Sequence, residues 1–182
     1  MKKSIIYYEK ENTGCLEWVE LIKKHNDMIE FQPSSFCTEK IIYSEYKCIG
    51  FLFSSYNGKL PEGIEYIAKH LVADKESYYF AICSGGKREI KAIYTLENKL
   101  KERGMNLEYV YTEFMLQRIS NDKDELVEKI LLDISEKNSM KEIVNERKEG
   151  INKKELHKEI KEIRKEYIKY LKEKNRKKKE KL

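Results

Sequence analysis

The first 138 residues of the chain alternate between short apolar runs and stretches in which apolar side chains recur every three or four positions. The apolar runs occupy residues 4–8, 28–31, 46–53, 77–83 and 106–116. The first, third and fourth runs are almost continuously apolar, which is typical of strands covered on both faces of a parallel sheet. The runs therefore predict five strands, at least three of them buried on both sides.

The stretches between the runs predict amphipathic helices at residues 16–22, 64–71, 90–100 and 126–134, and Gly104 follows the third helix where a C-terminus favours glycine. Residues 32–45 contain no clear helical pattern, so we expect one short or irregular crossover. Strand followed by helix, repeated, builds βαβ crossovers. The sequence therefore predicts an α/β domain with an open parallel five-stranded sheet, which we assign to residues 1–138.

Composition agrees with a globular domain that carries a basic appendage. Hydrophobic residues make up 40% of the 182-residue chain and charged residues 38%, with a net charge of +5. Residues 153–182 contain 14 Lys and Arg against 6 Asp and Glu, whereas the rest contains 23 against 26. Because the body is mildly acidic, the charge argues against a nucleic-acid-binding protein as a whole.

The C-terminal segment, residues 139–182, predicts a basic amphipathic helical extension. Leu156, Ile160, Ile163, Tyr167 and Tyr170 form a narrow apolar stripe with spacings of four and three residues. Such a stripe either docks on the body or pairs with a second copy as a homodimer through Leu156, Ile160, Ile163 and Tyr167. A further alternative is that the lysines at residues 176–181 attract a polyanion, but no aromatic side chains are interleaved among them.

The cysteines indicate neither disulfides nor a metal site. Cys15, Cys37, Cys48 and Cys83 are far apart, form no CxxC motif, and have no histidine at ligand spacing. The apolar stretch after the first residues is shorter than that of a signal peptide, and no apolar run approaches the length of a membrane span. We expect a soluble cytoplasmic protein with reduced thiols.

Three loops follow predicted strands and contain turn-forming residues: residues 9–15, 54–63 and 83–89. In an open parallel sheet, ligands bind at the carboxyl ends of the strands. The first loop opens directly into a helix, whose free N–H groups and dipole favour a phosphate. Each loop alone is also compatible with an ordinary turn or helix cap.

Taken in order, the three loops resemble those of the flavodoxin-like family, especially the short flavodoxin modules related to ferredoxin-fused flavodoxins. Thr13-Gly14 resembles the core of the loop that wraps the FMN phosphate. Ser55-Tyr56-Asn57-Gly58, with Pro61, resembles the loop that lays an aromatic ring along the flavin. Cys83-Ser84-Gly85-Gly86 resembles the loop whose backbone edges the ring, and residues 104–116 match the last strand.

This resemblance, which covers residues 3–135, implies the strand order 2-1-3-4-5 and non-covalently bound FMN. It implies that Tyr56 stacks on the ring, that the backbone of residues 55–58 and 84–86 hydrogen-bonds the ring edge, and that the first loop holds the phosphate. The implied cofactor-binding residues are Asn12, Thr13, Gly14, Cys15, Ser55, Tyr56, Asn57, Gly58, Ser84, Gly85 and Gly86. The cysteines that hold an iron-sulfur centre in the fused relatives are absent.

The first loop departs from the family pattern. Glu9, Lys10 and Glu11 stand where the family has hydroxyl side chains, and two carboxylates facing a phosphate would repel it. We therefore expect a phosphate loop whose backbone is intact and whose side-chain chemistry is degraded.

Two functions follow from this interpretation. The first is an FMN-binding protein that transfers electrons to an unidentified redox partner protein. The alternative is a flavodoxin fold without a cofactor that acts as a protein-binding or regulatory module through its C-terminal helix. The sequence offers no catalytic grouping of Ser, Cys, His and Asp and no GxxxxGK[ST] motif, so it does not indicate a hydrolase.

Overall fold

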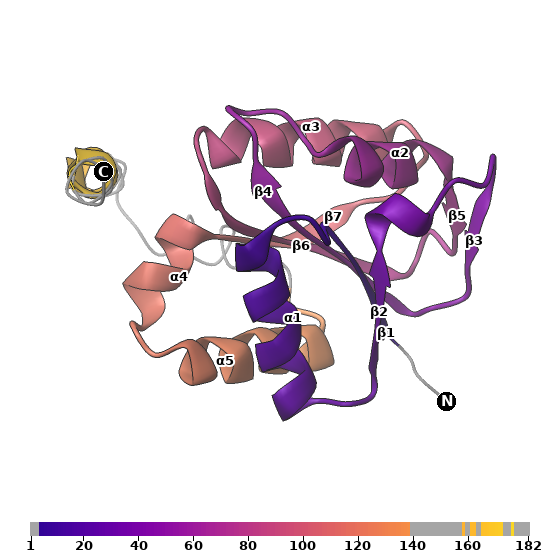
Figure 1. Cartoon of the computed structure of the whole chain (residues 1–182), viewed down its shortest axis with the longest axis horizontal. Coiled ribbons are helices and arrows are strands. Elements are labelled where there is room, and N and C mark those ends of the chain that lie inside the picture. Colours follow the sequence, from indigo (N-terminus) through magenta and orange to yellow (C-terminus); the bar gives the residue numbers. More distant parts are fainter. Residues whose placement is uncertain (1–3, 139–157, 159–160, 163–164, 173–175, 177–182) are drawn as a thin grey trace. The chain divides into compact units, whose positions relative to one another are not determined.

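A computed structural model describes residues 4–138, 158, 161–162, 165–172 and 176. Its centre is a five-stranded parallel sheet in the order β2-β1-β4-β6-β7 (Figure 1). The strands are β1 (Ser4–Tyr8), β2 (Ile29–Pro33), β4 (Cys48–Ser55), β6 (Tyr78–Gly86) and β7 (Leu107–Thr112). Counting only these strands, the order is 2-1-3-4-5, that of a flavodoxin-like doubly wound sheet. The predicted fold class is confirmed.

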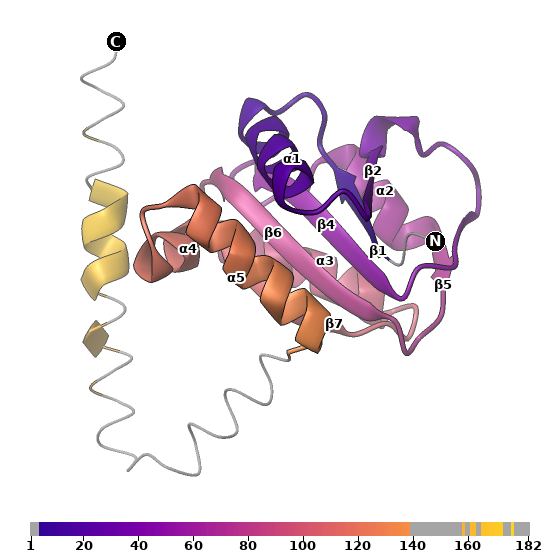
Figure 2. The same cartoon turned by 90° about the horizontal axis from the view of Figure 1, so that it is seen from below.

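Helices cover both faces of the sheet. On one face lie α2 (Glu62–His70) and α3 (Glu89–Lys101), and on the other lie α1 (Thr13–His25) and α5 (Lys123–Glu136) (Figures 1 and 2). The four helices predicted from periodicity are present at these places. Because α1, α2 and α3 each connect parallel strands of this sheet, the chain forms the βαβ crossovers expected from the sequence, and α5 follows the last strand.

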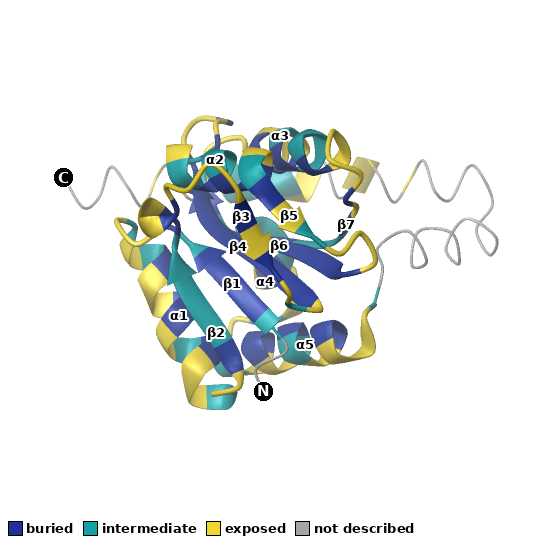
Figure 3. Ribbon diagram, turned by 90° about the vertical axis from the view of Figure 1, so that its right-hand side faces the viewer, coloured by how far each residue is buried: buried dark blue, intermediate teal, exposed yellow. Residues whose placement is uncertain are grey.

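β4 is buried along its whole length, and β1 and β6 are buried along most of theirs, as their nearly continuous apolar runs predicted (Figure 3). On β4, Phe51 and Phe53 pack on the α2 and α3 side, and Leu52 packs on the α1 and α5 side. Successive side chains of a strand point to opposite faces, so a strand inside a three-layer domain needs apolar residues at every position. Within this run, β4 has a glycine at position 50, because a Cβ there would lie 2.4 Å from the Phe80 ring.

The prediction of the last strand is correct in its first half and wrong in its second half. Residues 107–112 form β7, but residues 113–119 form the short helix α4 (Glu113–Ile119) rather than a continuation of the strand. The side chain of Thr112 accepts a hydrogen bond from the N–H of Met115 at 3.1 Å, and Glu113 occupies the first helical turn. A hydroxyl cap followed by an acidic residue starts a helix even within an apolar sequence.

The irregular crossover expected at residues 32–45 contains a 3-10 turn, η1 (Ser34–Phe36), and the short strand β3 (Ile42–Ser44). β3 pairs in parallel with β5 (Leu71–Ala73) to form a second, two-stranded sheet. This sheet is not predictable from the sequence, because strands of three residues are too short to show a periodicity.

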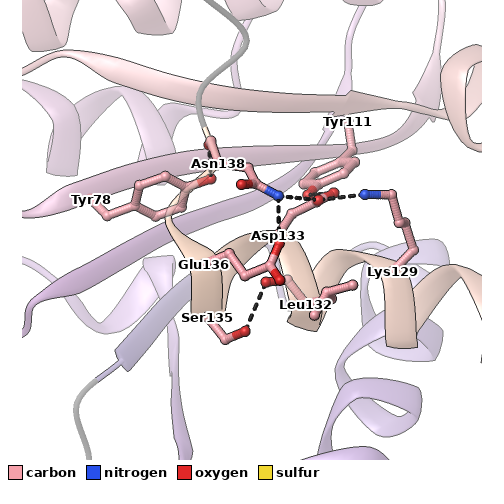
Figure 4. Close-up of polar contacts among 8 residues, drawn as sticks. All are labelled: Tyr78, Tyr111, Lys129, Leu132, Asp133, Ser135, Glu136 and Asn138. Carbon is pink, nitrogen blue, oxygen red and sulfur yellow. Dashed lines mark hydrogen bonds and ion pairs between the residues drawn. The ribbon is translucent and has the colours of Figure 1, made fainter. Parts of the chain in front are cut away.

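A buried polar cluster fixes the end of α5 (Figure 4). Asp133 is 1% exposed and accepts hydrogen bonds from Tyr111 Oη at 2.9 Å, Lys129 Nζ at 2.5 Å and Asn138 Nδ2 at 2.9 Å. Tyr78 Oη in turn donates to the carbonyl of Asn138 at 2.7 Å. Burial beside Asp133 raises the pKa of Tyr111 well above its usual range. The cluster thereby joins α5 to β6 and β7.

The chain divides into two units, Met1–Met140 and Lys141–Leu182, and each is described here by itself. In the second unit, residues 158, 161–162, 165–172 and 176 are helical, and the rings of Tyr167 and Tyr170 stack at 6.3 Å. Leu156, Ile160 and Ile163 of the predicted stripe lie outside the described residues. Within the described part of the chain, no helix is both long and apolar enough to cross a membrane.

Candidate functional site

The three loops singled out in the sequence leave the same edge of the sheet. β1 is followed by β2 on one side, whereas β4 lies on the other side, so the strand order reverses between β1 and β4. In open α/β sheets, ligands bind at such a switch point, outside the carboxyl ends of the strands. A Cβ at Gly14 in the first loop would lie 3.7 Å from Ser84 Oγ in the third. The structure therefore brings the three predicted loops together.

The first loop turns into α1 through a side-chain cap. Asn12 Oδ1 accepts a hydrogen bond from Cys15 N at 3.1 Å, and the helix starts with the exposed Thr13 and the half-buried Gly14. The Cys15 thiol points inward to Ser84 Oγ at 3.2 Å, and burial raises its pKa to about 12. Cys15 thus has both its N–H and its thiol engaged within the protein.

The sequence led us to expect Glu9 to face a phosphate in the first loop, but its side chain is buried and hydrogen-bonded within the protein. It is 5% exposed, and its Oε2 accepts a hydrogen bond from Ser54 N at 3.1 Å. Its Oε1 accepts a hydrogen bond from the hydroxyl of Tyr56, and this bond raises the Tyr56 pKa. Glu11, by contrast, is exposed. Only one of the two carboxylates is therefore free in solvent, and the other ties β1 to the loop after β4.

The second loop is a tight hairpin. Tyr56 and Lys59 exchange two backbone hydrogen bonds of 3.1 Å, and the residues between them, Asn57 and Gly58, have positive φ angles of 56° and 89°. This is the two-residue turn that Asn-Gly sequences favour. Ser55 Oγ accepts from Gly58 N at 3.0 Å and so stabilises the turn. Tyr56 projects from the hairpin and is 51% exposed.

The third loop is bonded to the second. Ser55 pairs with Gly86, and Ser55 Oγ donates to the carbonyl of Lys87 at 2.6 Å. Gly86 has a φ of 110°, and a Cβ there would lie 2.1 Å from the Ser55 carbonyl oxygen, so only glycine fits. Gly85 also has a positive φ, and its carbonyl accepts a hydrogen bond from the Cys83 thiol. The pairing of β4 with β6 thus extends to Ser55 and Gly86, at the start of the second and third loops. The backbone of these two loops was expected to contact the edge of a flavin ring.

Two cavities flank the loops. The larger, of about 460 Å³, lies between the first and second loops, and its lining includes Glu9, Glu11, Tyr56, Lys59, Leu60 and Glu62. The smaller, of about 300 Å³, lies between α1 and α4, and its lining includes Gly14, Glu17, Trp18, Ser84, Glu113 and Lys123. Carboxylates outnumber amines in both linings.

Three hydrogen-bond donors at this edge are already used within the protein. The N–H groups of Cys15 and Ser54 and the hydroxyl of Tyr56 already donate to side chains of the protein. The larger cavity offers apolar and aromatic surface, because Tyr56 is half exposed there and Leu60 and Pro61 line it.

Sequence reasoning missed the inward role of Glu9 and the contributions of Lys59, Leu60 and Glu62 to the cavity. A carboxylate placed directly after the apolar run of a central strand was a usable signal for Glu9. Lys59, Leu60 and Glu62 line the cavity because the hairpin turns the chain back over the first loop. Their residue types alone do not indicate this position.

Strand order and loop positions define the chain as an α/β protein of flavodoxin-like fold. It is similar to the crystal structure of a protein from Bacteroides uniformis ATCC 8492 whose name assigns it provisionally to the flavoproteins, with 15% identity over 71% of this chain and 97% of that chain and a TM-score of 0.50. It is also similar to a flavoprotein in complex with FMN from Lactobacillus acidophilus NCFM, with 12% identity over 67% of this chain and 100% of that chain and a TM-score of 0.48. The sequence matches no protein-family model and no curated protein.

Proposed function

We propose that this chain binds a flavin at the carboxyl edge of its sheet, in the cavity beside Tyr56, and carries electrons through it. The observation that supports this most is the convergence of the three predicted loops at the switch point between β1 and β4. The solved structure in complex with FMN that shares the general arrangement of the chain is consistent with it.

In this proposal, Tyr56 stacks on the flavin ring, and Leu60 and Pro61 exclude water from its other surface. A bound flavin supplies one- and two-electron redox chemistry, and the protein tunes it through the groups around the ring. The electron-transfer partner is a redox protein that the chain itself does not identify.

Titration of the purified protein with a flavin, followed by flavin fluorescence, tests the binding. We expect saturable quenching in the wild type and, in Tyr56→Ala, a loss of affinity of about threefold to tenfold, since an aromatic pair contributes about 0.5–1.5 kcal/mol beyond its buried area. Tyr43→Ala is the matched control, because Tyr43 is 74% exposed on β3, outside both cavity linings. A fluorescence signal that does not change on addition of protein would reject flavin binding.

Electron transfer requires a separate measurement. The protein with bound flavin is reduced anaerobically, and the reoxidation of the flavin by a one-electron acceptor such as ferricyanide is followed by its absorbance. Transfer at the same rate from free flavin would show that the protein contributes nothing to the reaction.

A second candidate function is favoured by the bonds that Glu9 and Ser55 make within the site. If these internal hydrogen bonds keep a cofactor out of the site, the domain binds no cofactor. It then acts as a protein-binding module through its C-terminal stripe, for example as a homodimer. The double substitution of Ile160→Asp and Ile163→Asp should then halve the mass measured by light scattering. A wild type that is already a monomer would reject the homodimer.

A further inference from the structure

Glu9 is a buried carboxylate at the switch point. It follows β1 directly, is 5% exposed, and accepts hydrogen bonds from Ser54 N and from the Tyr56 hydroxyl. Backbone N–H and hydroxyl groups are the donors by which proteins hold phosphate. At this edge an acidic side chain of the protein itself already uses two of them.

The neighbouring hydroxyl groups also face inward. Ser54 Oγ and Ser84 Oγ are 2.9 Å apart, and Ser84 Oγ contacts the buried Cys15 thiol at 3.2 Å. The Tyr56 pKa is raised chiefly by its hydrogen bond to Glu9, as expected when a hydroxyl donates to a carboxylate. The polar groups of the three loops are thus bonded to one another around Glu9.

The charge of the larger cavity also opposes the binding of a phosphate. Its lining contains three carboxylates, those of Glu9, Glu11 and Glu62, and one amine, that of Lys59. Like charges placed together at an interface cost binding free energy. An uncharged planar ligand meets no such repulsion and still gains the contact with Tyr56.

We propose that Glu9 is the built-in anion of this site and makes the cavity beside Tyr56 selective for an uncharged flavin, such as riboflavin, against FMN. This inference rests on the proposed flavin binding and specifies which form of the flavin is bound. Glu9 is a specificity-determining residue in this proposal, because its charge and its use of the donors both oppose a phosphate.

The test is a paired titration of the full-length wild type, Glu9→Gln and Glu20→Gln with riboflavin and with FMN. We expect the wild type to bind riboflavin at least about tenfold more tightly than FMN. Glu9→Gln removes the charge and keeps the shape, so the ratio of the two affinities should fall by at least about fivefold. Glu20→Gln, an exposed site further along α1, removes the same charge and should keep the wild-type ratio.

If Glu9→Gln does not fold, as judged by circular dichroism, the salt dependence of the wild type replaces it. Screening weakens repulsion between charges, so FMN affinity should rise with salt while riboflavin affinity stays level. FMN bound as tightly as riboflavin by the wild type, or an equal effect of both glutamine variants, would overturn the selectivity and leave flavin binding intact. Binding of neither flavin would overturn the proposed function and this inference together.

Discussion

The Asp133 cluster gives the sharpest test of how this fold is held together. Asp133→Ala removes the acceptor of three hydrogen bonds, from Tyr111, Lys129 and Asn138. Tyr111 is 1% exposed, so its hydroxyl would be left buried without this partner, at a cost of about 1–3 kcal/mol. Loss of the partner of a buried charge pair costs about 3–5 kcal/mol in all. Because the Lys129 side chain is 42% exposed and can turn to water, we expect about 3–4 kcal/mol, at the lower end of this range.

The assay is urea unfolding at neutral pH, followed by far-UV circular dichroism. We expect Tyr111→Phe to cost about 1–2 kcal/mol and the double variant to cost less than the sum of the two single changes, because both remove the same bond. Leu132→Ala is the control, since Leu132 is 50% exposed on the adjacent position of α5 and should cost within about 0.5 kcal/mol. An Asp133→Ala variant as stable as this control would refute the reasoning, as would strictly additive costs.

Four further predictions concern the loops and the thiols. Gly86→Ala forces a side chain into a positive φ and onto the Ser55 carbonyl, so it should destabilise the domain by at least about 2 kcal/mol in urea unfolding; wild-type stability would contradict the close contact. Asn12→Ala removes the cap of α1 and should cost about 1 kcal/mol in the same assay, whereas an unchanged midpoint would mean that water replaces the cap. Burial raises the pKa of both Cys15 and Cys83 to about 12 from an ordinary value of 9.0. At pH 8, iodoacetamide should therefore modify these thiols in urea and not in the native protein. Rapid labelling of the native protein would contradict their burial. The unfolded chain ionises these thiols above pH 9 and the folded chain does not, so stability should fall as the pH rises from 9 towards 12; a stability that is level or increasing over this range would contradict the sign.

The sequence by itself determined the class of fold. A central strand in a three-layer domain is buried on both faces, so its run is almost continuously apolar, as in residues 46–53, and amphipathic helices alternate with such runs. Local chemistry also located the loops, because Asn57-Gly58 specifies its own turn whatever surrounds it. The end of the last strand was predicted wrongly because the hydroxyl cap of Thr112 outweighed the apolar character of residues 114–116.

The tertiary structure alone decided how the predicted site residues are used. The sequence suggested that Glu9 faces a phosphate in the first loop. In the structure, the hairpin at residues 56–59 brings the Tyr56 hydroxyl to its carboxylate, and the adjacent strand supplies the N–H of Ser54. These contacts join residues more than forty positions apart, as their sequence separations of 45 and 47 show. A pattern within one segment cannot report which donor from another segment reaches a side chain. For that reason the sequence located the carboxyl edge, while packing determined that a carboxylate of the protein occupies its donors.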